Sequence, residues 1–242
     1  MIKFFRNIRL DLMEKNKTGK YLKYAFGEIV LVVVGILIAL QINNWNENRK
    51  AQQAQKSLLM SLYDNLEADS IALQTGRGYM MGIVETHKQL HTFRKGKIEA
   101  ADIENPSNIR SSIRNYSITK ANHPDIAAKV FNDALKEQIR EYYSLLAFME
   151  NSYTQYDNVV KEIVRPYLAD NIALNPDFPF YDQDSSESAL NLSQFYKVIK
   201  NDDFGQILFE SNLKANETIA FMDGLLAANS ELRLSIEREI SY

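Results

Sequence analysis

One long apolar run near the start of the chain dominates its hydrophobic pattern. Residues 29–40, IVLVVVGILIAL, contain no polar side chain, and the wider window 25–42 has only Glu28 and Gln41 as polar residues. A helix rises about 1.5 Å per residue, so about twenty residues cross the roughly 30 Å hydrocarbon layer of a bilayer. Residues 24–45 have that length. The pattern therefore predicts a transmembrane helix.

Aromatic residues flank this run as membrane interfaces favour. Tyr21 and Tyr24 precede it and Trp45 follows it, and tyrosine and tryptophan are enriched at the level of the lipid headgroups. No small-x-small cleavage site follows the apolar residues, so a cleaved signal peptide is the weaker interpretation. We expect residues 21–45 to form an uncleaved signal anchor in contact with membrane lipid, with Tyr21, Tyr24 and Trp45 as its interface anchors.

The charges on either side of the run predict its orientation. Residues 1–24 carry seven Lys or Arg side chains and two carboxylates, whereas the first turns after the run carry fewer cations, Arg49, Lys50 and Lys56. The positive-inside rule then places the N-terminus in the cytoplasm and residues 46–242 outside it.

The part of the chain beyond the anchor is acidic. The whole sequence has 28 basic and 31 acidic residues, and removing residues 1–24 and Glu28 leaves 21 basic and 28 acidic ones. An acidic domain repels the phosphates of nucleic acid, so we expect no nucleic-acid partner.

Residues 19–50 resemble the N-terminal signature of a family of single-span membrane proteins of unknown function that is common in Bacteroidota. Their sequence is GKYLKYAFGEIVLVVVGILIALQINNWNENRK. In that family a basic leader and this anchor precede a helical C-terminal region. The resemblance is strong over residues 1–50 and weak beyond them. It implies a Gram-negative envelope, and hence an inner-membrane anchor with a periplasmic domain, but no mechanism.

Helical periodicity continues beyond the apolar run. The polar run at residues 43–56 contains no helix-breaking residue, and alanine and leucine then recur at helical spacing up to Leu73. The triplet Gly76-Arg77-Gly78 predicts a turn. We expect a second helix from about residue 79 to residue 94, with Gly96 ending it.

The clearest pattern beyond the anchor is a heptad seam. Apolar and tyrosine side chains alternate spacings of four and three over more than four heptads. Tyrosine is a poor choice for a dry dimer seam, so a bundle-packing face is favoured over a parallel coiled coil as the interaction that the seam makes. The seam consists of Leu135, Ile139, Tyr142, Leu146, Met149, Tyr153, Tyr156, Val160, Ile163 and Tyr167.

The last third of the chain predicts one more long helix. Pro166 and the polar, proline-containing stretch after it predict the end of the seam helix and a long connection. A helix is then expected after Asn201-Asp202-Asp203. Its apolar residues at helical spacing are Ala215, Ile219, Met222, Leu226, Leu232, Ile236 and Ile240.

Together these elements predict an all-α protein with one N-terminal transmembrane helix and an extracytoplasmic bundle of about four main helices. Three segments follow: a basic cytoplasmic or interfacial segment at 1–20, the anchor at 21–45, and a periplasmic bundle domain at 46–242 with a membrane-proximal stalk helix. For residues 1–20, a short interfacial helix and a disordered leader both remain open.

Few residues indicate chemistry. Glu28 is the one ionisable residue in the apolar window, and a proton-path or partner-pairing role competes with a carboxylate that simply reaches the headgroups. His87 and His91 share a helix face at i and i+4 and form a weak candidate metal pair. Lys88 stands where a zinc protease has glutamate, and the chain has no cysteine to complete a site. A solvated helix face is the alternative.

Missing motifs argue against most enzyme classes. The sequence has three histidines, no cysteine, no glycine-rich phosphate loop and no nucleophile elbow. We therefore predict no catalytic residues, no cofactor and a non-catalytic protein. The favoured function is a membrane-anchored scaffold or accessory subunit of an envelope complex, as a homo-oligomer or with other proteins. A periplasmic sensory or ligand-binding four-helix bundle is the alternative.

Overall fold

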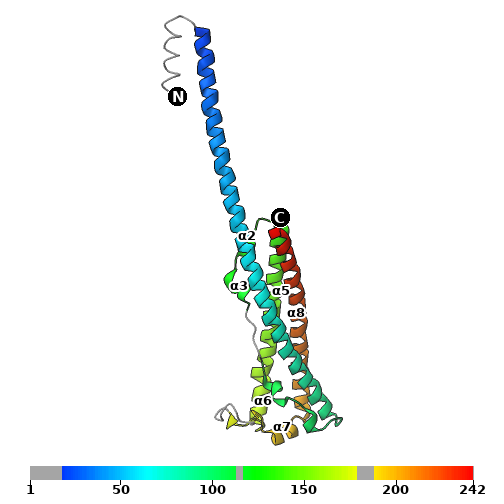
Figure 1. Ribbon diagram of the computed structural model, residues 1–242. Coiled ribbons are helices and arrows are strands. Elements are labelled where there is room, and N and C mark those ends of the chain that lie inside the picture. Colours follow the sequence, from blue (N-terminus) through cyan, green and yellow to red (C-terminus); the bar gives the residue numbers. More distant parts are fainter. Residues whose placement is uncertain (1–17, 113–116, 179–187, 242) are drawn as a thin grey trace. The chain divides into compact units, whose positions relative to one another are not determined.

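The computed structural model describes residues 18–112, 117–178 and 188–241 (Figure 1). Over these residues the chain is all-α, and its only β-type pairing is one isolated bridge between Leu174 and Leu190. The predicted fold class, a long apolar N-terminal helix followed by a helical region, is confirmed. The chain divides into two compact units, Met1–Ser57 and Leu58–Tyr242.

The first unit contains the N-terminal part of helix α2, which runs over Thr18–Arg94. Every large apolar side chain from Ile29 to Ile42 is exposed. Among the described residues, α2 is the one helix that is long and apolar enough to cross a membrane, and its apolar window buries nothing against the rest of the chain. The side chains of Tyr21 and Tyr24, and the whole of residues 1–17, lie outside the described part.

Helix α2 passes through Gly76-Arg77-Gly78 without a break, so the predicted turn is wrong. Leu73 and Met80, on either side of the triplet, are buried in one core cluster. Burying a large apolar side chain gains about 1.5–3 kcal/mol, whereas a glycine inside a helix costs about 1 kcal/mol relative to alanine. Burial on both sides of the triplet therefore outweighs the glycines, and one helix replaces the two that the sequence predicts.

The end of α2 lies where the sequence places it. Gly96 has a positive φ of 67°, a backbone conformation that glycine adopts without a steric cost. Gly96 N donates to Phe93 O at 2.9 Å and Lys97 N donates to Thr92 O at 3.2 Å. These two bonds form a Schellman motif, which satisfies carbonyls that the helix end would leave unpaired.

Three long helices form the second unit: α2 from Leu58 onward, α5 (Asp133–Asn158) and α8 (Asp202–Ser241). Side chains from all three meet in the core cluster, among them Leu62, Leu66, Met80, Leu135, Ile139, Leu146, Met222, Leu225 and Leu232.

Helix α8 is antiparallel to both partners. At one end Tyr63 donates to Glu237 at 2.7 Å, and toward the other end His87 lies beside Ser211. Along α5, Ser152 meets Thr218 with 3.1 Å between the hydroxyl oxygens. Helices α2 and α5 are therefore parallel, as Figure 1 shows.

Because α2 and α5 are parallel, the chain must return along the bundle between them. Within residues 95–132, the described residues 95–112 and 117–132 form short pieces: η1 (Ala100–Asp102), η2 (Pro106–Arg110), α3 (Ile118–Asn122) and α4 (Ile126–Lys129).

Polar side chains hold this return segment in place. Asn108 Nδ2 donates to Thr86 Oγ1 at 3.2 Å, and Asn122 Nδ2 donates to Asn65 Oδ1 at 2.9 Å, so the segment runs antiparallel to α2. On the α5 side, Tyr156 donates its hydroxyl to the carbonyl of Ser111 at 2.9 Å. The return segment thus occupies a place that a fourth long helix takes in a four-helix bundle.

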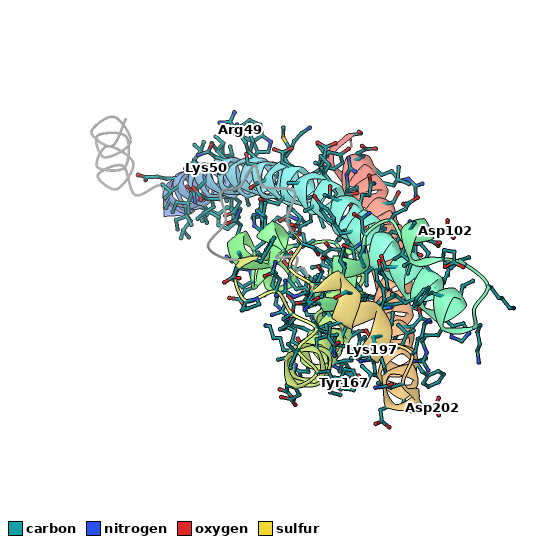
Figure 2. The ribbon with its side chains drawn as sticks, turned by 90° about the horizontal axis from the view of Figure 1, so that it is seen from below. Arg49, Lys50, Asp102, Tyr167, Lys197 and Asp202 are labelled. Carbon is teal, nitrogen blue, oxygen red and sulfur yellow. The ribbon has the colours of Figure 1, made fainter. Side chains whose placement is uncertain are left out.

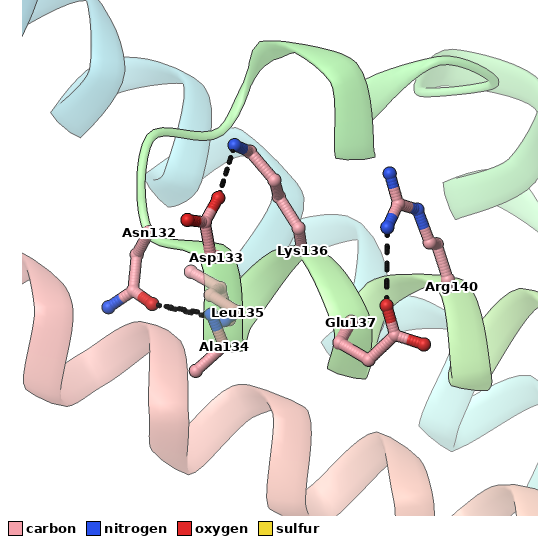
Figure 3. Close-up of polar contacts among 7 residues, drawn as sticks. All are labelled: Asn132, Asp133, Ala134, Leu135, Lys136, Glu137 and Arg140. Carbon is pink, nitrogen blue, oxygen red and sulfur yellow. Dashed lines mark hydrogen bonds and ion pairs between the residues drawn. The ribbon is translucent and has the colours of Figure 1, made fainter.

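The start of α5 is fixed by its own residues. Asn132 Oδ1 accepts hydrogen bonds from Ala134 N at 3.0 Å and Leu135 N at 3.2 Å, while Lys136 Nζ pairs with Asp133 Oδ1 at 2.6 Å (Figure 3). An asparagine N-cap of this kind satisfies otherwise unpaired backbone donors.

The predicted seam faces the chain's own bundle core. Its residues from Leu135 to Val160 are buried, and they are Leu135, Ile139, Tyr142, Leu146, Met149, Tyr153, Tyr156 and Val160. In this fold the seam serves packing within one chain, because α8, α2 and the return segment cover it.

The seam changes register after Val160. Ile163, predicted to be buried, is 42% exposed, and Val164 is buried in its place. A π-helix, η3 (Val159–Val164), explains the change: Arg165 N donates to Val160 O, five residues back. The extra residue in that turn advances the buried positions by one.

The same wide turn precedes Pro166, which the sequence predicts as a helix end. Instead the helix continues as α6 (Arg165–Asp170). A proline inside a regular α-helix clashes with the carbonyl four residues back, and the π-turn changes the spacing of the backbone at that point. Leu168 then packs in a second buried cluster with Phe195 of α7 (Leu192–Val198) and Phe204 of α8.

Alanine substitutions test this register. We expect Val164→Ala to lower the free energy of unfolding by about 2 kcal/mol, because it removes two buried carbon atoms and leaves a cavity. Ile163→Ala should cost less than about 1 kcal/mol, because its side chain is partly in solvent. Urea unfolding of the full-length protein in a non-ionic detergent, followed by circular dichroism, measures both. A larger loss for Ile163→Ala would contradict the register.

Candidate functional site

An open groove lies between the C-terminal end of α2 and the N-terminal end of α8. It has a volume of about 840 Å³. Figure 2 views the bundle from this end, with Asp202 labelled at the start of α8. The lining residues are His87, Lys88, His91, Thr92 and Arg94 from α2, Lys95 directly after it, and Asp202, Gly205, Gln206, Leu208, Phe209 and Asn212 from α8. The groove combines imidazole, cationic and amide groups, so it is the candidate functional site.

His87 is the buried polar residue of this groove. Its side chain is 1% exposed, which contradicts the solvated face that the sequence favours for it. The Nε2 atom lies 3.3 Å from Ser211 Oγ. Burial lowers the pKa of His87 to about 4, and a side-chain hydrogen bond with Asn212 acts in the opposite direction. The imidazole is therefore neutral at neutral pH.

The two histidines of the predicted metal pair have different surroundings. His91 is exposed, one turn beyond the buried His87. His123, the third histidine, accepts a hydrogen bond from Asn65 Nδ2 at 3.0 Å. Asn65 lies several turns before His87 on α2, so His123 is not near the other two histidines. Over the described residues no group of three or more His, Asp or Glu side chains is placed to hold a metal ion.

Arg94 closes one end of the groove. Its Nη1 donates to the carbonyls of Ile199 and Asn201, which follow α7. Gly205 leaves room for it, because a Cβ at that position would lie 2.5 Å from Arg94 Nη2. The guanidinium thus ties α2 to the connection between α7 and α8 through two of its five N–H donors.

The rim of the groove carries more positive than negative charge. Lys88, Arg94 and Lys95 line it with one carboxylate, Asp202. Lys88 has an ion pair with Glu85 at 3.8 Å, in which both side chains are more than half exposed, and such a pair contributes little. Cations near the end of α2 also favour the negative end of the helix dipole. The positive rim stands out on a chain that is acidic beyond the anchor.

A much smaller cavity of about 20 Å³ lies midway along the bundle, beside Asp69 and Tyr142. Buried Asp69 accepts hydrogen bonds from Ser117 Oγ at 2.5 Å, Ile118 N at 2.6 Å and Thr119 N at 3.2 Å. The carboxylate thereby fixes the start of α3 on α2. This space is about the size of one water molecule, so Asp69 has a structural role.

The remaining predicted site residues belong to the first unit. Glu28 is partly exposed within α2. Trp45 is 64% exposed, and the Arg49 guanidinium lies over its ring, 5.4 Å from the centroid.

Sequence reasoning missed Asn212, Ser211 and the buried state of His87. A signal was present in the spacing. His87 follows Met80 by seven residues and precedes Leu90 by three, so it falls on the same apolar stripe of α2. A histidine at such a position is buried by its neighbours, whatever its polarity.

The lowered pKa of His87 predicts a pH-dependent stability. Exposed in the unfolded chain, this group has a pKa of 6.5, against about 4 when folded. Between these values the unfolded chain binds a proton that the folded chain does not, so stability is full above about pH 6.5 and falls as the pH drops toward about 4. The whole effect is on the order of 3 kcal/mol.

Unfolding in urea at pH 4.5, about 5.5 and about 7 measures this effect. His87→Gln should show a shallower loss of stability over that window than the parent protein, because it lacks the titrating group. His91→Gln is the matched control and should keep the parent slope, since His91 is exposed. Equal slopes for the parent and His87→Gln would contradict the assignment.

Part of the chain matches a known protein family. Residues 28–92 match DUF6090, a family of unknown function. No curated protein and no solved structure matches the chain. The matched residues lie wholly within α2, from the apolar run to the last turn that lines the groove. The match therefore agrees with the expected resemblance to a family without a known function, and it brings no activity.

Proposed function

We propose that the protein is a non-catalytic, membrane-anchored helical scaffold or accessory subunit of an envelope complex. In this proposal residues 21–45 cross the inner membrane, the N-terminus is cytoplasmic and the helical bundle is periplasmic. One observation carries it: a single unbroken helix, α2, contains both the exposed apolar run and a face of the bundle core.

The exposed apolar run supports the membrane anchor. Eleven large apolar side chains between Ile29 and Ile42 are exposed in sequence on one helix. A contiguous apolar surface of this size is not stable in water. A helix satisfies all of its backbone hydrogen bonds internally, which a bilayer requires. Lipid is therefore the covering that fits this segment best.

The flanking charges support the orientation. Seven Lys or Arg side chains precede the run in residues 1–24, and such an excess remains on the cytoplasmic side. The family match spans both the apolar run and the bundle-packing part of α2, because it begins at residue 28 and ends near the last turn of the same helix. This supports a function that requires both parts.

An aromatic pair on the bundle, with Phe148 exposed and Phe221 partly buried, supports a protein partner. Phe148 of α5 lies over Phe221 of α8 with 6.4 Å between ring centroids, and 54% of Phe148 is exposed. Aromatic residues are enriched in the buried centres of protein interfaces. This pair is where we place the contact with a partner or with a second copy.

Native mass spectrometry of the full-length protein, purified in a mild detergent at native expression, tests the proposal. We expect a stoichiometric partner or a homo-oligomer. Phe148→Ala should reduce that assembly at least tenfold, because hot-spot aromatics each contribute about 2 kcal/mol or more. Glu137→Ala, an exposed position on the same helix, is the matched control and should leave it intact. A lone monomer from both the parent and the control would contradict the scaffold function.

A second candidate function is a periplasmic ligand-binding or sensory domain. The specific observation that favours it is the groove between α2 and α8, which is lined by the buried His87 together with Asn212 and exposed lysines. Small-molecule sites are concave and hold a few polar groups that fix the ligand, and this groove has both features.

A further inference from the structure

We propose that the protein forms a two-fold dimer in which an outer face of α2 and α8 packs against the same face of a second copy. The inference rests on the proposed scaffold function and names the partner as a second chain. This surface, the α2–α8 face, consists of Ile71, Gly78 and Met81 of α2 and Ala220, Gly224 and Ala227 of α8. Phe148 belongs to α5 and is not part of it, so the aromatic pair is left to a different protein.

The α2–α8 face is apolar and exposed. Ile71 is 63% exposed and Met81 is 49% exposed, and Ala220 and Ala227 are exposed on the neighbouring helix. The two alanines lie one turn before and one turn after Asp223, which pairs with α2 and so keeps them beside it. Neighbouring apolar side chains on one surface are typical of a contact with another protein.

Two glycines at the centre of this face have no role within the chain. Gly78 and Gly224 directly follow Arg77 and Asp223, whose side chains pair across the two helices, so they lie at the same level of the bundle. A Cβ at either glycine would meet no atom within 4 Å. Alanine is more favourable than glycine inside a helix, so a single chain gains nothing from them.

Other glycines of the bundle are explained by the chain itself. Gly96 has a positive φ, and Gly205 leaves room for the guanidinium of Arg94. The remaining use of a glycine inside a helix is to let another backbone approach closely. A second helix packed on the α2–α8 face therefore accounts for Gly78 and Gly224.

The charges on the face identify the second helix as part of another copy. Two ion pairs join α2 to α8, and their polarity is opposite: α2 supplies the cation Arg77 to Asp223 but the anion Glu67 to Arg233. In two copies related by a two-fold axis along the helices, Arg77 lies opposite Asp223 of the second copy, and Glu67 lies opposite its Arg233. Every charge then faces the opposite charge, which favours association.

The side chains of these pairs are available to a second copy. Asp223 is 48% exposed and Glu67 is 54% exposed, so both carboxylates can accept from a second cation. The same symmetry places α2 of each copy against α8 of the other, with Gly78 near the level of Gly224. It also keeps the Leu58 ends of both bundles together, as copies anchored in one membrane require. The anchor and the charges thus agree on one axis.

Sedimentation equilibrium of the full-length protein in a density-matched, non-ionic detergent tests the inference. We expect a reversible dimer. The double variant Gly78→Ala with Gly224→Ala should weaken the dimer Kd by about tenfold or more, because the added methyl groups hold the two backbones apart. The same variant should raise the urea midpoint, measured at a concentration where the parent is monomeric, because alanine is the better helix former.

The opposite signs of these two effects exclude a general loss of stability as the cause. Gly82→Ala is the control on the same helix. Its Cβ would lie 4.0 Å from Asn108 Nδ2, on the side of the return segment, so it should keep the parent Kd. Equal weakening by Gly82→Ala would overturn the α2–α8 face.

The remaining outcomes separate this inference from the function on which it rests. A parent dimer whose Kd the double glycine variant leaves unchanged would overturn the face and leave self-association standing. A monomeric parent that retains another protein in native mass spectrometry would overturn the dimer and leave the scaffold function standing. A parent that is monomeric and without any partner would contradict both.

Discussion

The burial of one face of α2 determines how the second unit is built. Because α2 does not end until Arg94, its apolar stripe from Leu59 to Leu90 needs partners along its whole length. Helices α5 and α8 provide them, and both must be long for that reason. The chain leaves α2 at one end of the bundle, so it has to travel back before α5 can begin parallel to α2. The return segment 95–132, with its short helices and polar contacts, is a direct consequence of an uninterrupted α2.

Two polar residues on the buried stripe of α2 illustrate different outcomes of burial. Asp69 is fully engaged by the hydroxyl and backbone donors that begin α3, so its carboxylate stabilises the return segment. His87 has hydrogen-bonding contacts with Ser211 and Asn212, and its burial keeps the imidazole neutral at neutral pH.

The sequence predicts the regular helices of this fold better than the places where helical periodicity is disturbed. The apolar run, the seam from Leu135 to Val160 and the end of α2 at Gly96 are readable because periodicity and glycine chemistry are local. The continuity of α2 through Gly76-Arg77-Gly78 cannot be predicted from local sequence, because α5 and α8, which are distant in the chain, bury Leu73 and Met80 and so outweigh the cost of two glycines. The register change at Ile163 depends on a π-turn that leaves no mark in a heptad count. The groove is also formed by tertiary structure, because Asn212 of α8 and His87 of α2 are far apart in the sequence and meet only in the folded bundle.

The continuity of α2 is the central claim, and the distance between two spin labels tests it most directly. The chain has no cysteine, so Ile71→Cys and Glu85→Cys provide two unique labelling positions. Both positions are exposed, and they lie on either side of Gly76-Arg77-Gly78. Fourteen residues of continuous helix separate the labelled backbones by about 21 Å. Pulsed electron paramagnetic resonance on the full-length protein in detergent should give a single narrow distribution near that value, broadened by the label linkers. A main peak at about 10 Å, the spacing of two packed antiparallel helices, would mean that the chain turns at Gly76-Arg77-Gly78. That result would contradict a continuous α2.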